Sequence, residues 1–254
     1  MGQSTAYVAD VAKTRADVLL VERQLVQSRA RAQALILAGK VFTSDRRIEK
    51  AGERIADDAP LEVRGQDIPF VSRGGLKLQD ALNAFEYDPN GKAVADFGSS
   101  TGGFTDCLLQ RGAVRVYAID VGWGQLHNKL RQDERVIVME RVNARHLTND
   151  DLPEPVQLVV IDASFIGIAK LLPAVRAVLG PGGDVLAMVK PQFEVGRERV
   201  GRGGVVRNEA HRLEAIDNVA KAGAALGFEE VKRADNEVTG PKGNREAFLW
   251  LRLL

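Results

Sequence analysis

The chain has 254 residues, enough for one catalytic α/β domain and a small accessory domain. Its 35 lysines and arginines balance 34 aspartates and glutamates, so the net charge alone indicates no charged partner. One cysteine, Cys107, excludes an internal disulfide, and the three histidines show no spacing typical of a metal site. No apolar run approaches the roughly 18 residues of a membrane-spanning helix. We therefore expect a cytoplasmic protein that binds no metal and does not enter a membrane.

The amino-terminal part divides into a tail, a small domain and a linker. Residues 1–12 show no hydrophobic periodicity and are expected to be a flexible tail. Residues 13–64 predict a small α+β domain, in which eight basic residues between Lys13 and Arg47 stand against three acidic ones. Residues 65–70 are polar and turn-prone, which is typical of a linker. The local excess of positive charge favours an acidic partner for the small domain.

Within the small domain the sequence predicts a well-delimited helix and a small sheet. The helix follows Ser28, a favoured N-cap residue, and ends before Gly39, a residue type favoured directly after helices. A shorter helix is expected before it. The segments Lys40–Thr43 and Leu61–Val63 have the composition of short strands, and Ser44–Asp45 is expected to turn after the first of them.

Residues 71–254 alternate short apolar strands with helices. Such runs are typical of buried parallel strands, and the helices supply the crossovers that parallel strands require. The last two strands, Glu229–Ala234 and Ala247–Leu253, have no helix between them and predict an antiparallel pair that closes the sheet. This pattern predicts a doubly wound α/β fold. The other expected elements are strands at Ala93–Asp96, Val114–Asp120, Val136–Met139, Leu158–Asp162 and Val185–Val189 and helices at Ile168–Leu179 and Asn208–Leu226.

A glycine-rich turn follows the first strand of this second domain. It runs from Asp96 through Gly98 to the Gly102–Gly103 pair, at a strand end where open α/β sheets bind ligands. Asp120 ends the next strand, where a carboxylate can accept hydrogen bonds from the ribose hydroxyls of an adenosine. The glycine spacing differs from the GxGxxG typical of nicotinamide cofactors and favours S-adenosylmethionine. The alternative is a tight turn without a ligand, with Asp120 as a helix cap.

Four charged residues are candidates for catalysis without a cysteine, a histidine or a metal. Asp162 and Lys190 end the fourth and fifth strands, so their side chains are expected at the same edge of the sheet. Lys77 precedes the sheet, and Glu246 begins its last strand. A lysine at the end of a buried strand is costly unless it is paired, which favours a functional site. The alternative is a structural ion-pair network.

These four residues, in this order, resemble the Lys-Asp-Lys-Glu tetrad of the FtsJ-like ribose 2′-O-methyltransferases. From Arg15 onward the chain is more closely similar to the TlyA or hemolysin A family of ribosomal RNA 2′-O-methyltransferases. The turn Ser44–Asp45 departs from the Asn-Gly often seen at this place in the family. The blocks that carry the resemblance are Ser72–Leu78, Asp96–Phe104, Asp162–Phe165, Leu179–Gly183, Lys190–Glu194, Gly203–Val206 and Gly240–Glu246.

The resemblance implies a Rossmann-like methyltransferase fold, S-adenosylmethionine as cofactor and a cytidine 2′-hydroxyl of 16S or 23S ribosomal RNA as target. The chemistry agrees, because a ribose hydroxyl is a poor nucleophile until its proton has an acceptor. Lys190 is the expected base, Asp162 orients it, and Lys77 with Glu246 holds the ribose. The residues expected to bind the cofactor are Ser72, Asp96, Gly98, Ser99, Thr101, Gly102, Gly103, Phe104, Asp120, Asp162 and Ser164.

The small domain resembles the S-four-type RNA-binding domain through Ala16–Leu20, Ser28–Ile36 and Gly39–Val41. Arg29 and Gln33 lie four residues apart and therefore share a helical face that can meet phosphates. For any one of these side chains, the alternative is a solvated surface without a partner. The candidates for RNA contact are Arg15, Arg29, Arg31, Gln33 and Lys40.

The leading hypothesis is therefore a methyltransferase that acts on ribosomal RNA and has ribosomal subunits as partners. Two rivals belong to other classes: a non-catalytic RNA-binding or assembly factor, and a lytic protein of the kind that the name hemolysin implies. The intact candidate catalytic residues argue against the first. The lack of a membrane-inserting sequence pattern argues against the second.

Overall fold

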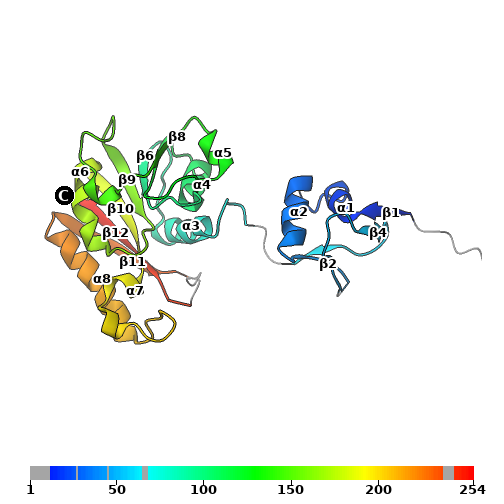
Figure 1. Ribbon diagram of the computed structural model, residues 1–254. Coiled ribbons are helices and arrows are strands. Elements are labelled where there is room, and N and C mark those ends of the chain that lie inside the picture. Colours follow the sequence, from blue (N-terminus) through cyan, green and yellow to red (C-terminus); the bar gives the residue numbers. More distant parts are fainter. Residues whose placement is uncertain (1–11, 27, 45, 65–67, 237–242) are drawn as a thin grey trace, which may run out of the picture. The chain divides into compact units, whose positions relative to one another are not determined.

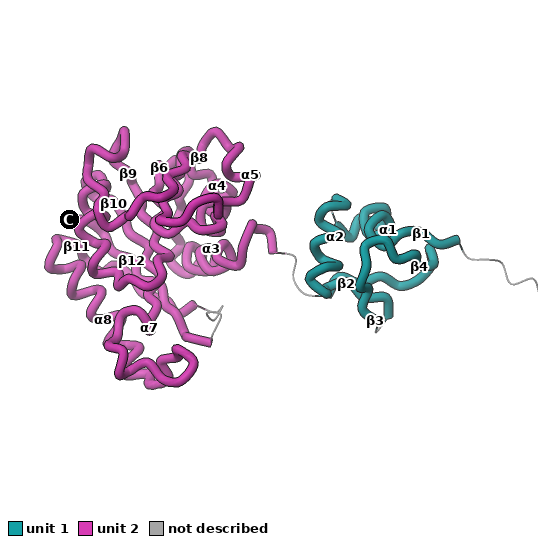
Figure 2. The backbone as a smooth tube through the Cα atoms, viewed as in Figure 1, with its two compact units in different colours: residues 1–67 teal, residues 68–254 magenta. Residues whose placement is uncertain are grey.

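The computed structural model describes residues 12–26, 28–44, 46–64, 68–236 and 243–254. Contacts within the chain divide it into two compact units, residues 1–67 and 68–254 (Figure 2). Most of the expected tail, Asp45 of the expected turn and half of the expected linker lie outside the described residues. No helix of the described residues is long and apolar enough to cross a membrane.

The amino-terminal unit is a small α+β structure (Figure 1). Its longer helix has the expected bounds, since the Ser28 Oγ accepts a hydrogen bond from the Arg31 N–H and Gly39 follows with a φ of +69°. Apolar side chains of both helices, including Leu20 and Ile36, form one core. The elements are β1 (Lys13–Arg15), α1 (Ala16–Glu22), α2 (Arg29–Leu37), β2 (Val41–Thr43), β3 (Arg46–Arg47), β4 (Arg54–Ala56) and β5 (Glu62–Val63).

The strands of this unit form two sheets rather than one. The expected sheet is present as β3-β2-β5, with antiparallel pairing on both sides of β2. A second sheet pairs β1 with β4, antiparallel, and was not expected from the sequence. Each of these two strands has three residues, which is too short for an alternating pattern to identify it.

The larger unit contains a seven-stranded sheet in the order β11-β12-β10-β9-β6-β7-β8. Neighbouring strands are parallel except at β12, which runs antiparallel to both β10 and β11, as expected. The chain order reverses between β6 and β9, where open α/β sheets form their ligand crevice. The strands are β6 (Ala93–Phe97), β7 (Arg115–Asp120), β8 (Val136–Glu140), β9 (Val156–Ile161), β10 (Leu179–Val189), β11 (Phe228–Asp235) and β12 (Ala247–Leu253).

Helices cover both faces of this sheet (Figure 1). Because alternate residues of a strand point to opposite faces, Val94 packs with α3 and α4 whereas Phe97 packs with α6 and α8. Two apolar cores result, one on each face. The helices are α3 (Gly74–Phe85), α4 (Gly103–Gln110), α5 (Asn128–Arg131), α6 (Leu172–Val178), α7 (Pro191–Glu194) and α8 (Glu209–Ala224), with short 3₁₀ turns η1 (Ala144–His146), η2 (Ile168–Lys170) and η3 (Arg197–Arg199).

Two expected elements of the larger unit have different bounds. Strand β10 begins at Leu179 rather than Val185, and its pairing with β9 shifts register between Leu179 and Asp184. The helix expected to begin at Ile168 is divided into η2 and α6. Pro173 explains the division, because proline has no N–H to continue a helix and is tolerated only in the first turn.

Strand β6 places Asp96 beneath the glycine-rich turn with no exposed surface. Its Oδ2 accepts a hydrogen bond of 2.7 Å from the Thr105 hydroxyl of α4. Burial raises the pKa of Asp96 to about 7, although the Thr105 hydrogen bond opposes this shift. The folded protein therefore keeps this proton almost to neutral pH, whereas the unfolded chain loses it near about pH 4.

We predict that Asp96→Asn removes part of the pH dependence of folding. Between about pH 4 and about pH 7 the folded wild type binds a proton that the unfolded chain has lost, so its stability falls as the pH rises through this window. Asparagine cannot ionise and keeps an acceptor for Thr105. Thermal unfolding at about pH 5 and about pH 8 should therefore show a smaller fall in the variant. An equal fall in both proteins would contradict the raised pKa.

Candidate active site

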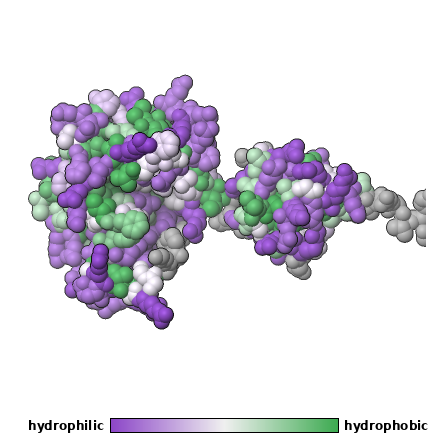
Figure 3. All heavy atoms as spheres, in the orientation of Figure 1, coloured by the Kyte–Doolittle hydropathy of each residue, from purple (hydrophilic) through white to green (hydrophobic). Residues whose placement is uncertain are grey.

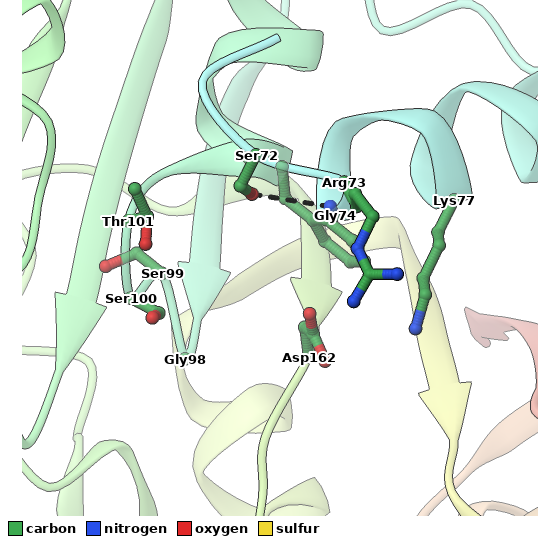
Figure 4. Close-up of a pocket in the computed structure, with 11 residues that line it drawn as sticks. Ser72, Arg73, Gly74, Lys77, Gly98, Ser99, Ser100, Thr101 and Asp162 are labelled. Carbon is green, nitrogen blue, oxygen red and sulfur yellow. Dashed lines mark hydrogen bonds between the residues drawn. The ribbon is translucent and has the colours of Figure 1, made fainter. Parts of the chain in front are cut away.

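Three cavities open at the carboxyl-terminal edge of the sheet, and Asp162 lines all of them. The first, of about 170 Å³, lies at the glycine-rich turn (Figure 4). The second, of about 390 Å³, is lined from the ends of β6 and β7 and from the segment after β9. The third, of about 410 Å³, is lined from the segments that follow β9 and β10 and precede β12. Asp162 reaches all three because it directly follows β9, at the point where the chain order reverses.

The glycine-rich turn needs its glycines because other segments approach it closely. Gly98 has a φ of +91°, and a Cβ there would lie 2.9 Å from the carbonyl oxygen of Asp162. A Cβ on Gly103 would lie 2.2 Å from the Oγ of Ser72. That Oγ accepts a hydrogen bond of 3.3 Å from the Gly74 N–H (Figure 4). The turn therefore lies between the residue that follows β9 and the start of α3, and Asp162 and α3 both line the first cavity.

Asp120 joins the glycine-rich turn to the loop after β7. Its Oδ2 accepts a 2.8 Å hydrogen bond from the Ser100 N–H, and its Oδ1 accepts one of 2.7 Å from the Gly122 N–H. The N-cap of the following helix, α5, is His127, so the helix-cap alternative for Asp120 is wrong. Asp120 lines the second cavity, and carboxylate oxygens can accept more than one hydrogen bond. It can therefore bind a ribose while it holds both loops.

The first two cavities suit the two ends of S-adenosylmethionine. Polar side chains line the first, among them Ser99 and Arg73, and match a charged amino-acid group. The second combines the carboxylate of Asp120 with apolar side chains such as Ile119 and Leu171, which match a ribose and a flat purine. The residues present therefore fit this cofactor.

Most residues expected to bind the cofactor line the first two cavities. Asp96 and Gly102 do not, because Asp96 is buried behind the turn and Gly102 is the N-cap of α4. Arg73, Ser100 and Gln125 also line these cavities, but such residue types in a loop carry no distinctive sequence signal. The expected residues that do line them are Ser72, Gly98, Ser99, Thr101, Gly103, Phe104, Asp120, Asp162 and Ser164.

The four candidate catalytic residues lie around the third cavity. The Nζ of Lys77, on α3, lies 2.5 Å from Oε2 of Glu246, which directly precedes β12. The Nζ of Lys190, which directly follows β10, lies 2.5 Å from Oδ1 of Asp162 and donates a 3.0 Å hydrogen bond to the Oγ of Ser164. Two ion pairs therefore line this cavity.

These ion pairs are largely removed from solvent. The side chains of Lys77 and Glu246 are 10% and 1% exposed, and those of Lys190 and Asp162 are 11% and 25% exposed. Burial raises the pKa of Asp162, and the positive charge of Lys190 opposes this shift. Each charge therefore depends on its partner to offset the cost of desolvation.

Two aromatic side chains and one buried side-chain amide also line the third cavity. Phe165 is 91% exposed and has a φ of +67°, and its ring centroid lies 5.3 Å from that of Phe193. Asn244 is 2% exposed and lines the same cavity two residues before Glu246. Nothing in the sequence pattern singles out Asn244, because it is uncharged and lies in a glycine-containing loop.

In the amino-terminal unit, candidate RNA contacts converge on one buried carboxylate. Asp17 has no exposed surface and accepts hydrogen bonds from Arg15, Arg29 and Gln33. These bonds, above all those of Arg15, hold the pKa of Asp17 well below its usual range. Arg15 and Arg29 remain 47% and 58% exposed, so the network orients their guanidinium groups without covering them. The candidates outside these hydrogen bonds are Arg31 and Lys40.

Comparisons with known proteins agree with this architecture. Residues 70–253 match the family model described as FtsJ-like methyltransferase. The chain is 47% identical to "Putative rRNA methyltransferase YqxC" of Bacillus subtilis, over 94% of this chain and 85% of that relative. It is 44% identical to "16S/23S rRNA (cytidine-2'-O)-methyltransferase TlyA" of Mycobacterium tuberculosis, over 94% of this chain and 90% of that relative.

A solved structure is similar to this chain over nearly its whole length. "Putative hemolysin from Streptococcus thermophilus" has a TM-score of 0.74 and 39% sequence identity, and the match covers 96% of this chain and 90% of that one. The matched family model spans the seven-stranded sheet, the glycine-rich turn and the four candidate catalytic residues. The chain therefore belongs to the FtsJ-like methyltransferase family.

Proposed function

We propose that this protein transfers the methyl group of S-adenosylmethionine to a ribose 2′-hydroxyl of ribosomal RNA. FtsJ-like methyltransferases use this cofactor, and two relatives are named as rRNA methyltransferases. The name of the Mycobacterium tuberculosis relative specifies cytidine 2′-O-methylation of 16S and 23S rRNA, which supports a cytidine as the target here. Ribosomal subunits are then the partner, and we expect the protein to act in the cytoplasm.

The observation that carries this proposal is the position of the two ion pairs. They line a cavity that shares Asp162 with both cofactor cavities. A ribose in the third cavity would therefore lie next to the methyl donor. Buried ion pairs contribute little net stability, so a non-catalytic assembly factor has no evident use for two of them at this junction.

The residues around the third cavity can activate and hold a hydroxyl group. S-adenosylmethionine supplies an electrophilic methyl group when it is bound. The hydroxyl proton needs an acceptor as the oxygen attacks, and the Nζ of Lys190, in its neutral form, can take it. Asp162 and Ser164 fix the position of that nitrogen. Lys77 and Glu246 offer a donor and an acceptor to the ribose hydroxyls, which would hold the target in line for attack.

An in vitro methylation assay with the purified protein tests this proposal. Ribosomal subunits from cells that lack the protein are incubated with S-adenosylmethionine that carries a labelled methyl group, and the RNA is then digested to nucleosides. We expect the label in a 2′-O-methylated nucleoside. Label on a base, or no label in RNA under conditions in which the cofactor binds, would contradict the proposal.

We predict that Asp120→Ala weakens S-adenosylmethionine binding by about 1–3 kcal/mol. The substitution removes the ribose acceptor and frees the loops that Asp120 joins. Isothermal titration calorimetry measures the change. Asp133→Ala is the control, because Asp133 also accepts a backbone N–H but lines none of the three cavities. Equal affinity in wild type and Asp120→Ala, or a preference for NAD, would overturn the assignment.

We predict that Lys190→Ala lowers single-turnover methylation by about 10²–10⁴-fold, because the general base is lost. Lys190→Ala also leaves Asp162 unpaired, so a loss of about 3–5 kcal/mol in stability is expected whether the ion pair is catalytic or purely structural. Lys190→Arg separates the two roles: arginine keeps a positive charge beside Asp162 but stays protonated and cannot act as a base. We expect this variant to bind cofactor and to melt near the wild-type temperature, yet to remain inactive. Near-normal turnover in Lys190→Arg would rule out the base assignment.

We also propose that the amino-terminal unit binds RNA through the face around Asp17. Arg29→Gln removes a charge from this face but keeps a donor for Asp17, so the unit should stay folded. RNA affinity should fall, and the slope of log affinity against log salt should decrease by about 0.7–0.9 for one lost phosphate contact. Lys50→Gln, an exposed residue of the same unit outside these hydrogen bonds, is the control. If Arg29→Gln matches Lys50→Gln in affinity and slope, the proposed face is wrong.

A further inference from the structure

The segment Gly196–Arg207, here called the arginine loop, lies at the third cavity. It has four arginines and one glutamate, and Val200 and Gly204 contribute to the cavity wall. Figure 3 shows strongly hydrophilic side chains at the lower end of the larger unit, where Figure 1 places this loop in yellow. Among the described residues, three of its arginines are exposed and have no side-chain partner: Arg197, Arg202 and Arg207.

The backbone of the arginine loop forms a defined turn. The Gly204 N–H donates to the Gly201 carbonyl at 3.0 Å, and the Gly201 N–H donates to the Val205 carbonyl at 3.0 Å. Gly203 has a φ of +83°, a backbone conformation that favours glycine, and is the third residue of the turn Gly201–Gly204. Arg202 occupies the second position, at the tip of the turn. The loop therefore presents this guanidinium from a fixed backbone.

Asn244 joins the arginine loop to the segment that directly precedes β12. Its Oδ1 accepts a 2.9 Å hydrogen bond from the Val206 N–H, and its Nδ2 donates one of 2.8 Å to the Gly204 carbonyl. Both polar groups of the buried Asn244 side chain therefore form hydrogen bonds with the arginine loop. Because Asn244 lies two residues before Glu246, these bonds fix the loop relative to the ion pair that lines the cavity. Arg199 of the loop also forms an ion pair of 2.6 Å with Glu214 of α8.

We propose that the arginine loop binds backbone phosphates of the RNA strand next to the target nucleotide, and that Asn244 is the positioning residue that holds the loop in place. This inference rests on the proposed RNA methylation. A nucleotide whose ribose occupies the third cavity brings its neighbouring phosphates to the cavity rim, beside the loop that carries the unpaired arginines. Arginine suits this role because its planar fork of donors matches phosphate oxygens.

The first experiment compares Arg197→Ala/Arg202→Ala with Arg176→Ala/Lys221→Ala. The control pair removes the same charge from exposed positions on α6 and α8 that line none of the three cavities. Binding of ribosomal RNA by the full chain should weaken about tenfold or more in the first pair only, with a smaller salt slope. S-adenosylmethionine affinity should stay unchanged in both pairs. Equal RNA affinity in the two pairs would overturn the inference.

The second experiment tests the positioning role of Asn244 by combining Asn244→Ala with the two arginine substitutions. Asn244→Ala should raise the KM for RNA and leave cofactor affinity unchanged. When it is added to Arg197→Ala/Arg202→Ala it should weaken RNA binding little further, because the loop it positions has already lost its charges. Fully additive losses, or a parallel loss of cofactor affinity, would overturn the positioning role. Wild-type protein that neither binds nor methylates ribosomal RNA would refute the proposed function itself.

Discussion

The ion pair between Asp162 and Lys190 is the interaction on which the rest of the site depends. The two residues follow neighbouring parallel strands, β9 and β10, so the sheet brings their side chains to one edge. Burial raises the pKa of Asp162, and the adjacent positive charge of Lys190 counters this effect. The pair therefore holds both groups in place where the cofactor cavities meet the third cavity.

The second ion pair shows why the direction of the last strand matters. Lys77 and Glu246 are 169 residues apart, on α3 and directly before β12. Because β12 runs antiparallel to β10, its first residue lies at the same edge as the last residues of the parallel strands. A parallel strand in this position would bring its last residue to the cavity instead. The antiparallel strand thus completes a charged set that the parallel strands alone do not supply.

The central strands of the larger sheet could be predicted from the sequence because they are buried on both faces and read as continuous apolar runs, whereas β11, at the edge of the sheet, is largely exposed. The glycine-rich turn and the charged strand ends are likewise visible as local patterns. The roles of Asp17 and Asn244 could not be predicted in this way. Asp17 accepts hydrogen bonds from Arg29 and Gln33, which lie 12 and 16 residues away, and Asn244 forms hydrogen bonds with residues 38 and 40 positions earlier. Such contacts depend on tertiary structure, which no local periodicity encodes.

Mapping of ribose 2′-O-methyl groups across ribosomal RNA tests the central claim most directly. RNA from cells that contain the protein is compared with RNA from cells that lack it and from cells that carry only the Lys190→Arg variant. We expect at least one 2′-O-methylated cytidine that is present with the wild-type protein and absent from the other two. Identical methylation maps in all three would contradict the assignment of this protein as a ribosomal RNA 2′-O-methyltransferase.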